Sequence, residues 1–471
     1  MSASGYRREI GPFSATMLVA GSMIGSGIFL VSAEIVRLGG TATFLLGAWA
    51  LAALFSVGGA LSYAELGAEH PRAGGYYVFL REAYGPMVGF LCGWTSFLVV
   101  ECGSIAAVAV GFGRYLGSFL PAVSDSIWWI GPLKASAWRP FPELAPHFAL
   151  GPYELGLTPA RAAGIVLILV FMGIHAHGVR LGARVQNVFS LAKVAALGAL
   201  IVLGLVLPLR GAPAPGPAPL EPGHLPLLAA LLVAQVGCTF SGDGWQYLAM
   251  VGAEIREPKR TLPRAMLLGT TLVFGLYLLA NVAYLRVLGP TGIAQAAGDR
   301  VASATLGALL GARAELLMAG AILMSTVGWM NGSTLTSPRV YQAMAADGLF
   351  FQGAARLNAH GVPMGAMRIM AAWACVLTLT GTYSQLLEYI IFSALLFYAL
   401  TAAGSLLLRR RQPESTGTYR APTLLTVVYV AGAAAILGAL LLYRPAFALP
   451  GLGLVLLGIP VYLLRRRAMV G

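Results

Sequence analysis

Charged residues are scarce in this chain of 471 residues, since Asp, Glu, Lys and Arg together make up only 10% of it. Hydrophobic residues account for 58%, a combination that no single soluble domain of this length shows. The scarcity of charge therefore excludes a soluble globular protein. It predicts a polytopic membrane protein, with all of 1–471 forming one transmembrane domain.

Cysteine is rarer still. The four cysteines (Cys92, Cys102, Cys238 and Cys375) all fall inside apolar stretches, which excludes an extracellular disulfide framework. The sequence also lacks the GxxxxGK[ST], HExxH, CxxC and GxSxG motifs, so we expect no enzyme, no cofactor and no metal site. The absence of a nucleotide-binding loop argues against an ATP-driven pump.

The apolar stretches are long enough to cross a bilayer many times. We expect an all-α membrane protein with twelve transmembrane helices, at about 12–37, 41–67, 84–117, 161–180, 184–208, 226–253, 264–288, 313–338, 364–383, 385–408, 422–443 and 446–464.

The net charge of +13 is spread in a way that indicates topology rather than binding to nucleic acid. With the N-terminus inside, Lys and Arg favour the cytoplasmic connections by roughly two to one, which predicts that both termini are cytoplasmic. The basic clusters at 409–411 and 465–467 are interpreted first as topology determinants and second as contacts to membrane lipid headgroups.

The first apolar stretch contains the motif GSMIGSGIF (21–29), with three glycines and two serines near the middle of the bilayer. Glycine disfavours helix, and unwound backbone at this depth must face protein or a wet cavity. The motif predicts a helix broken at the midplane, which is typical of a transporter substrate site. A small-residue packing face at Gly21 and Gly25 is the alternative.

A second break is expected at FSGDGW (240–245), five helices later. Because a unit of five helices crosses the membrane an odd number of times, the second unit starts from the opposite side of the membrane. We therefore expect a five-plus-five inverted repeat. The repeats are 12–208 and 226–408, with 422–464 appended.

Three ionisable residues lie so deep in the predicted spans that a shift of the span boundaries would not bring them to the membrane surface: Glu101, Lys193 and Asp243. Such residues are costly in a bilayer and normally mark function. Glu101 could instead be a structural acid bonded to a neighbouring helix, and Lys193 could extend towards the cytoplasm.

The two breaks together favour an α-amino acid as ligand. Free amides of Gly25, Ser26 and Gly27 suit a carboxylate. Carbonyls near Ser22 and Met23, with those near Phe240 and Ser241, suit an ammonium group.

Four segments carry a resemblance to a known family: GSMIGSGIF, GGYYVFLREAYGP (74–86), SGDGWQYLAMVGAEIREPKRTLPRAM (241–266) and MNGSTLTSPRVYQAMAADG (330–348). In this order they resemble the amino acid–polyamine–organocation superfamily, and within it bacterial members of the L-type amino acid transporter family. The resemblance covers about 20 to 350.

The resemblance implies the leucine-transporter fold, with the helices of 12–37 and 226–253 unwound at the midplane. It implies that Phe240 is the outer gate. It also implies that Lys193 takes the place of a sodium ion, beside Ser325 or Thr326, so that transport is sodium-independent. The substrate-binding residues expected are Ser22, Met23, Ile24, Gly25, Ser26, Gly27, Phe240, Ser241, Gly242 and Asp243.

The chain departs from the family pattern in three ways. Gly242 stands where an aromatic residue is frequent, which predicts a roomier pocket. Glu101 stands where the family is expected to have an uncharged or basic residue, which makes proton coupling or a cationic substrate an alternative. The segment 118–160, expected to form interfacial helices or a lid, has no cysteine, so we expect no disulfide-linked heavy chain.

These observations predict an amino acid exchanger or proton-coupled symporter of a bacterial inner membrane. The alternatives are a cationic amino acid or polyamine antiporter, and a transport-dead amino acid sensor or channel that keeps the fold. Whether Lys193 is a fixed charge or a proton carrier stays open.

Overall fold

The structure is a computed structural model that describes residues 5–136, 153–209, 216–219, 225–311, 314–380, 383–411 and 419–470. The described chain is almost entirely helical. Its α-helices are α1 (Pro12–Met23), α2 (Val31–Gly39), α3 (Ala42–Glu69), α4 (Tyr76–Tyr84), α5 (Pro86–Thr95), α6 (Glu101–Gly117), α7 (Pro159–His175), α8 (Val179–Val206), α9 (Leu227–Ser241), α10 (Tyr247–Met250), α11 (Pro258–Ala294), α12 (Val301–Leu310), α13 (Ala314–Thr336), α14 (Pro338–Ala346), α15 (Met364–Thr380), α16 (Tyr383–Arg411), α17 (Thr423–Tyr443) and α18 (Pro445–Val470).

Seven helical stretches in the described part of the chain are long and apolar enough to cross a membrane. They run over Ala42–Glu69, Pro86–Gly117, Val179–Val206, Pro258–Ala294, Ile390–Arg411, Thr423–Tyr443 and Ala448–Arg465. The shorter apolar helices include α7, α9, α12 and α15. The prediction of a multi-pass membrane protein is thus confirmed, since the described chain is a bundle of apolar helices, several of which are long enough to cross a membrane.

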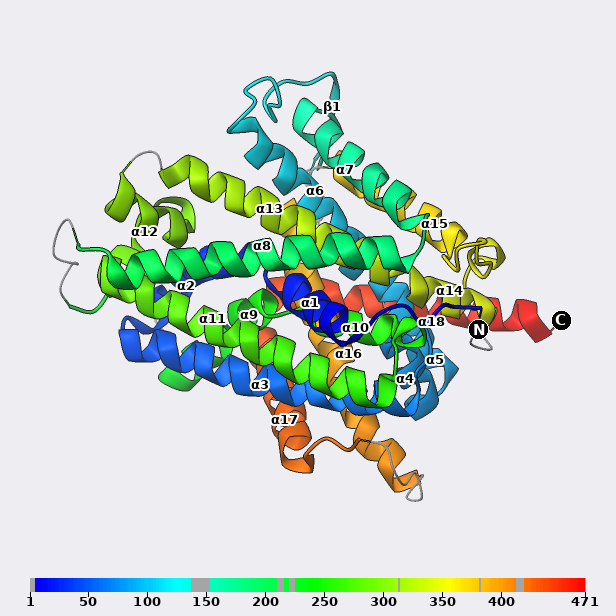
Figure 1. Cartoon of the computed structure of the whole chain (residues 1–471). Helices are drawn as coiled ribbons and strands as arrows, with labels where there is room; N and C mark the ends of the chain where they lie inside the picture. Colours follow the sequence, from blue (N-terminus) through cyan, green and yellow to red (C-terminus); the bar gives the residue numbers. More distant parts are fainter. Residues whose placement is uncertain are drawn as a thin grey trace.

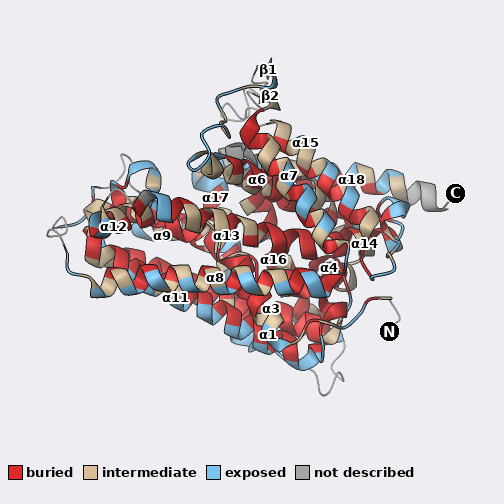
Figure 2. Ribbon diagram, turned by 45° about the horizontal axis from the view of Figure 1, so that its top comes forward, coloured by how far each residue is buried: buried red, intermediate tan, exposed pale blue. Residues whose placement is uncertain are grey.

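The outer faces of α8 and α11 carry exposed residues, which Figure 2 shows as pale bands on these helices. On α8, Val188 and Leu191 are 67% and 61% exposed, and on α11 Leu268 is 59% exposed. Contiguous exposed Leu and Val would be unfavourable in water. Such surfaces fit contact with lipid chains.

The helices α3, α8 and α11 run side by side, and α1 packs between α8 and α11 (Figure 1). Both ends of the chain lie at the same end of the molecule, whereas α2 and α12 lie at the opposite end (Figure 1). The apolar core is continuous and includes residues from α1, α3, α6, α9, α11 and α16.

Hydropathy did not predict α4, α12 or α14, three helices of nine or ten residues. The helix α4 packs against α5 and α16, and α14 packs against α13 and α15. These helices are too short to give a membrane-spanning signal, so only their tertiary contacts reveal them.

The sequence predicts interfacial helices or a lid in 118–160. The interfacial helices are not found in the residues that the structure describes between α6 and α7, which include an antiparallel hairpin of β1 (Ile130–Ala135) and β2 (Tyr153–Leu157), whereas 137–152 lie outside the described residues. The lid stays a prediction. Alternating residues such as Tyr153, Leu155 and Leu157 favour strand over helix.

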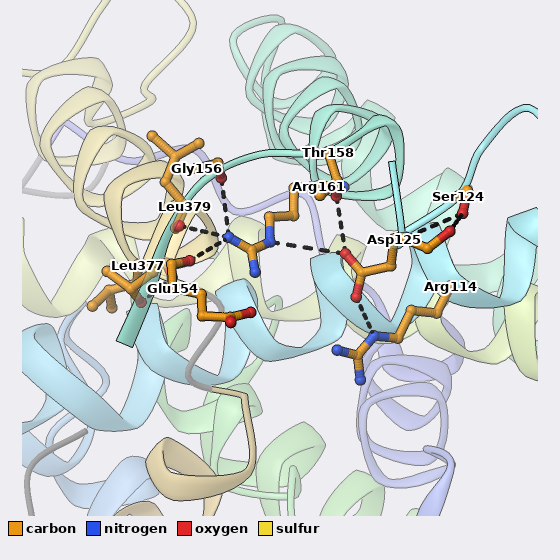
Figure 3. A network of polar contacts seen from close by, with 11 residues as sticks. Arg114, Ser124, Asp125, Glu154, Gly156, Thr158, Arg161, Leu377 and Leu379 are labelled. Atoms are coloured by element: carbon orange, nitrogen blue, oxygen red, sulfur yellow. Dashed lines mark hydrogen bonds and ion pairs between the residues drawn. The ribbon is translucent and has the colours of Figure 1, made fainter. Parts of the chain in front are cut away.

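Arg161 at the start of α7 holds this hairpin in place (Figure 3). Its Nη1 donates to the carbonyl oxygens of Glu154, Gly156 and Leu379 at 2.8–3.0 Å. Asp125 accepts from Arg114 Nε at 2.9 Å and lies 3.9 Å from Arg161 Nε. The guanidinium therefore joins the hairpin to α7 and to the end of α15.

Candidate functional site

The first apolar helix is interrupted inside the motif GSMIGSGIF. The helix α1 ends at Met23, and Ile24 is extended, with φ −72° and ψ 93°. A single 3-10 turn, Gly27–Phe29, precedes the start of α2 at Val31. No hydrogen bond from the amides of Ser26 and Gly27 to another described group is present. These two N–H groups are available to a ligand.

The second interruption follows α9, which ends at Ser241. Residues 242–246 are not helical, and the short helix α10 begins at Tyr247. Here the backbone is satisfied locally, since Asp243 N donates to Phe240 O at 3.2 Å and Gly244 N donates to Gln246 Oε1 at 3.0 Å.

The two interruptions pack directly against each other through glycine. A Cβ on Gly27 would lie 2.9 Å from Ser241 Cα and 2.3 Å from its Oγ. A Cβ on Gly244, whose φ is +126°, would lie 2.7 Å from the carbonyl group of Ser22. Both glycines are required by close backbone approach, and Gly244 also by its left-handed conformation. Gly25 has open space around it instead.

Tyr277 of α11 connects the two interruptions. Its hydroxyl lies 2.9 Å from both Met23 O and Ser241 O. A phenol has one hydrogen to donate, so it can serve only one of these carbonyls at a time. The other carbonyl keeps acceptor capacity, as an ammonium group would need.

Lys193 of α8 binds the carbonyl ends of α1. Its Nζ donates to Gly21 O and Ile24 O, both at 2.7 Å, and its side chain is buried. Ser325 of α13 donates to the same Ile24 oxygen at 3.0 Å. Gly328 leaves room for the lysine, because a Cβ there would lie 2.7 Å from Lys193 Cε.

A cavity of about 70 Å³ lies where the two interruptions meet. Its walls come from both interruptions and from α6, α13 and α16, and consist of Met23, Gly25, Ser26, Gly27, Ser104, Val108, Phe240, Ser241, Asp243, Thr326, Trp329 and Ile390. Seven of the residues expected to bind substrate are therefore brought together around one cavity.

Three other predicted residues do not line this cavity. Ser22 is buried behind it against Gly332, and Ile24 contributes the carbonyl that Lys193 and Ser325 share. Gly242 does not enlarge the pocket, since a Cβ there would lie 2.4 Å from Phe274 Cζ. The space that an aromatic residue would fill at Gly242 is filled by Phe274.

The structure separates the predicted coupling residues. Thr326 lines the cavity, but its hydroxyl donates within its own helix to Leu323 O at 2.8 Å. Glu101, which follows the π-helical turn Ser96–Val100, accepts from hydroxyl groups of Tyr247, Ser333 and Ser337 at 2.6–3.2 Å. No ion pair within 4.0 Å joins Glu101 to Lys193 in the described structure.

Sequence reasoning missed Tyr277 and Trp329. Both are aromatic residues in long apolar helices, where core packing is the usual role. Tyr277 and Tyr284 are seven residues, about two helical turns, apart and so lie on the same face of α11, and Tyr284 donates to Ile28 O at 3.4 Å. This spacing of two tyrosines on one helix face is the signal in the sequence that could have identified Tyr277.

Comparison with known proteins identifies the family of the chain. A family model described as amino acid permease matches residues 10–455. The chain belongs to the amino acid permease family. Its resemblance to the L-type transporters of the amino acid–polyamine–organocation superfamily is thereby confirmed, and it is a multi-pass amino acid permease.

Several relatives align over nearly the whole permease. The human large neutral amino acids transporter small subunit 2 is 30% identical over 465 residues, 97% of this chain and 80% of the relative. The serine/threonine exchanger of Bacillus subtilis is 27% identical, covering 98% of this chain and 97% of the relative. The human b(0,+)-type amino acid transporter 1 is 26% identical over 427 residues, 90% of this chain and 80% of the relative.

Proposed function

We propose that this permease moves α-amino acids across a bacterial inner membrane by alternating access, without sodium, as an exchanger or proton-coupled symporter. The observation that carries the proposal is the Lys193 ammonium group, bonded to Gly21 O and Ile24 O beside Ser325. Carbonyl and hydroxyl oxygens are the ligands of a hard cation, and here the protein's own cation occupies them.

The cavity suits the two charged ends of an amino acid. The carboxylate would bind the amides of Ser26 and Gly27, which have no partner in the described structure. The ammonium would bind the carbonyls of Met23 and Ser241, which compete for one hydrogen of Tyr277, with Phe240 O as a third acceptor. The side chain would extend towards Trp329 and Ile390.

Phe240 would act as the outer gate. It lines the central cavity and two neighbouring cavities. Movement of this ring would open the site to one side. Alternating access would involve a rocking motion of the twelve spans. These spans comprise the inverted repeats 12–208 and 226–408, which contain the unwound helix pair, and the appended 422–464.

The proposed topology has both termini in the cytoplasm, in keeping with their position at one end of the molecule (Figure 1). The relatives named above include a serine/threonine exchanger from a bacterium and transporters of large neutral amino acids. We propose a neutral amino acid as substrate and no disulfide-linked heavy chain.

Counterflow in proteoliposomes tests this function. Purified permease, loaded inside with unlabelled neutral amino acid, should accumulate labelled amino acid with saturable kinetics. Binding without flux would indicate a sensor. Flux without stimulation by internal amino acid would indicate a channel.

A cationic amino acid or polyamine antiporter is the second candidate, because the carboxylate of Asp243 lines the cavity. Excess unlabelled arginine or putrescine should then abolish counterflow of the labelled neutral amino acid, and Asp243→Asn should relieve that inhibition.

A further inference from the structure

Residues 5–10, which precede α1, form hydrogen bonds with the segment that follows α10. We call residues 5–10 the strap. The amides of Glu9 and Ile10 donate to Glu254 O at 2.9 and 3.0 Å, and the amide of Arg256 donates to Ile10 O at 2.9 Å. These bonds make a short parallel β-bridge. Backbone bonds thus fix the strap to a segment that is distant in the sequence.

The strap lies where the inner halves of both interrupted helices end. The helix α1 begins at Pro12, directly after the strap, and its last residue, Met23, lines the central cavity. The helix α10 follows the second interruption and ends at Met250, shortly before the bridged segment. Figure 1 shows the strap in dark blue, running from α1 past α10 towards the end of the molecule where both termini lie. Both half-helices therefore lead from the cavity to the strap.

Tyr6 anchors the strap. Its side chain is 1% exposed and forms a small apolar cluster with Ala73, Ala253 and Leu357. Its hydroxyl donates to Gln342 Oε1 at 3.3 Å. These partners come from the α3–α4 connection, the segment after α10, the loop before α15, and α14. Because a buried aromatic side chain has a large contact area, this one residue joins four segments to the strap.

The surface under the strap is itself held by the surrounding helices. Arg339 of α14 donates to both carboxylate oxygens of Glu254 at 3.0 and 3.2 Å, and this ion pair is buried. Arg7 of the strap donates to Ala359 O at 3.2 Å, and Asn358 of the same loop is bonded to the residue after α7. The strap therefore connects α1 and α10, the two inner half-helices, to α14 and to the end of α7.

The contacts of the strap are few enough to be broken and remade. The main ones are three backbone bonds, the buried ring of Tyr6 and the exposed side chain of Arg7. Chain segments with few buried contacts open locally at much lower cost than the core. Release of Tyr6 would separate the inner half-helices from α14 without unfolding either of them.

We propose that the strap closes the cytoplasmic side of the permease. With Tyr6 in its pocket, α1 and α10 are held against α14 and the central cavity is shut towards the cytoplasm. When Tyr6 leaves the pocket, the two half-helices are free to move apart and the substrate can pass. This role rests on the proposed transport function and topology, and it assigns to residues 5–10 a part in the transport cycle.

The accessibility of the Tyr6 pocket tests the proposal. Ala73→Cys places a thiol in the pocket, where the native side chain is 8% exposed, and Cys375→Ala removes the one half-buried native thiol of the described chain. A membrane-impermeant maleimide should label this parent slowly in inside-out vesicles. Adding Tyr6→Ala should speed labelling at least about tenfold, since truncation of a buried aromatic removes more than one such factor.

Two further variants separate the ring from other effects. Tyr6→Phe keeps the ring and loses only the bond to Gln342, so it should be labelled nearly as slowly as the parent. Arg8→Ala changes an exposed side chain of the strap and is the matched control, with an unchanged labelling rate. Leu357→Ala widens the pocket from the opposite side and should speed labelling while Tyr6 is kept.

The same variants link the strap to transport. Opening of the cytoplasmic side lowers the fraction of permease that can bind substrate from outside, and the apparent affinity falls with that fraction. The KM for uptake of labelled L-leucine or L-serine into cells should therefore rise at least about twofold in Tyr6→Ala and in Leu357→Ala. It should stay unchanged in Arg8→Ala.

The outcomes separate the two proposals. Absence of counterflow with any amino acid overturns the transport function and the role of the strap with it. Normal counterflow by the parent, with equal labelling of the parent and Tyr6→Ala, overturns the strap alone. Faster labelling of Tyr6→Ala with an unchanged KM also overturns it, because the strap would then open without affecting the substrate site.

Discussion

The two helix interruptions are built differently although they form one site. In the first, the carbonyls of Gly21 and Ile24 are bonded by side chains of other helices, Lys193 and Ser325. In the second, the backbone is satisfied nearby in sequence, through the Asp243 amide and the side chain of Gln246. The first interruption therefore depends on how α8 and α13 are placed, and the second largely does not.

Charge follows the same division. The first interruption is bonded by a buried cation of α8, Lys193, whereas the second interruption contains an acid, Asp243, within its own segment. The comparison teaches that α8 and α13 act on the first interruption alone, whereas α11 contacts both interruptions through Tyr277. Substitutions in partners should affect the first interruption most, and the predictions below run from the largest effect to the smallest.

Lys193→Ala should have the largest effect. Two hydrogen bonds from a charged donor are worth about 1.5–3 kcal/mol each, against about 0.5–1.5 kcal/mol for the neutral bond of Ser325. We expect much weaker substrate binding and exchange in Lys193→Ala, with a small remaining activity, and only a modest loss of affinity in the control Ser325→Ala. Binding and counterflow, measured on protein that elutes as a single folded species, check this.

The pH profile of the same lysine variant sharpens the assignment. If Lys193 is a fixed charge, the remaining activity is low at every pH, and if it titrates, the variant loses the pH dependence of the wild type. Unaltered binding and exchange in Lys193→Ala would contradict its role.

Gly27→Val should abolish uptake, because its side chain would collide with the backbone of Ser241 and cover the adjacent amides. Gly25→Ala is the matched control, since a Cβ at that position meets open space. It should fold normally and lose only part of its substrate affinity. Normal transport by Gly27→Val would place the substrate elsewhere.

Phe240→Ala should slow exchange far more than it weakens equilibrium binding. Phe240 lines three cavities, while the backbone carbonyl proposed to bind the amine is kept in the variant. Counterflow rates and binding constants measured on one preparation give the comparison. An unchanged exchange rate would count against the gate.

Tyr277→Phe should have the smallest effect. It removes one neutral hydrogen bond shared between Met23 O and Ser241 O, worth about 1 kcal/mol, and leaves both carbonyls free for the substrate. We expect a slightly lower melting temperature and nearly unchanged affinity. A complete loss of binding would mean that the hydroxyl contacts the substrate itself.

Local patterns in the sequence carried much of the candidate site. Glycine clusters placed both interruptions, because a missing side chain weakens helix wherever it occurs. Lys193, Glu101 and Asp243 were recognisable because charge is rare in apolar spans. These signals need no knowledge of what packs against them.

The rest depended on tertiary packing. The hydroxyl partners of Glu101 come from α10, α13 and the turn that follows α13, so no local pattern pairs them with it. Phe274 fills the space at Gly242, a contact between α11 and the loop after α9 that hydropathy cannot indicate. The hairpin of β1 and β2 was not predicted, because the proline and tryptophan content of 118–160 indicates an interfacial segment more strongly than its short alternating pattern indicates a strand.

The central claim is that the protein's own ammonium group replaces a sodium ion at the first interruption. Its most direct test is the initial rate of uptake of a labelled neutral amino acid into proteoliposomes containing the wild type, with external sodium replaced by potassium. The account predicts equal rates and equal KM in the two salts. A rate that requires sodium, or rises with its concentration, would contradict it.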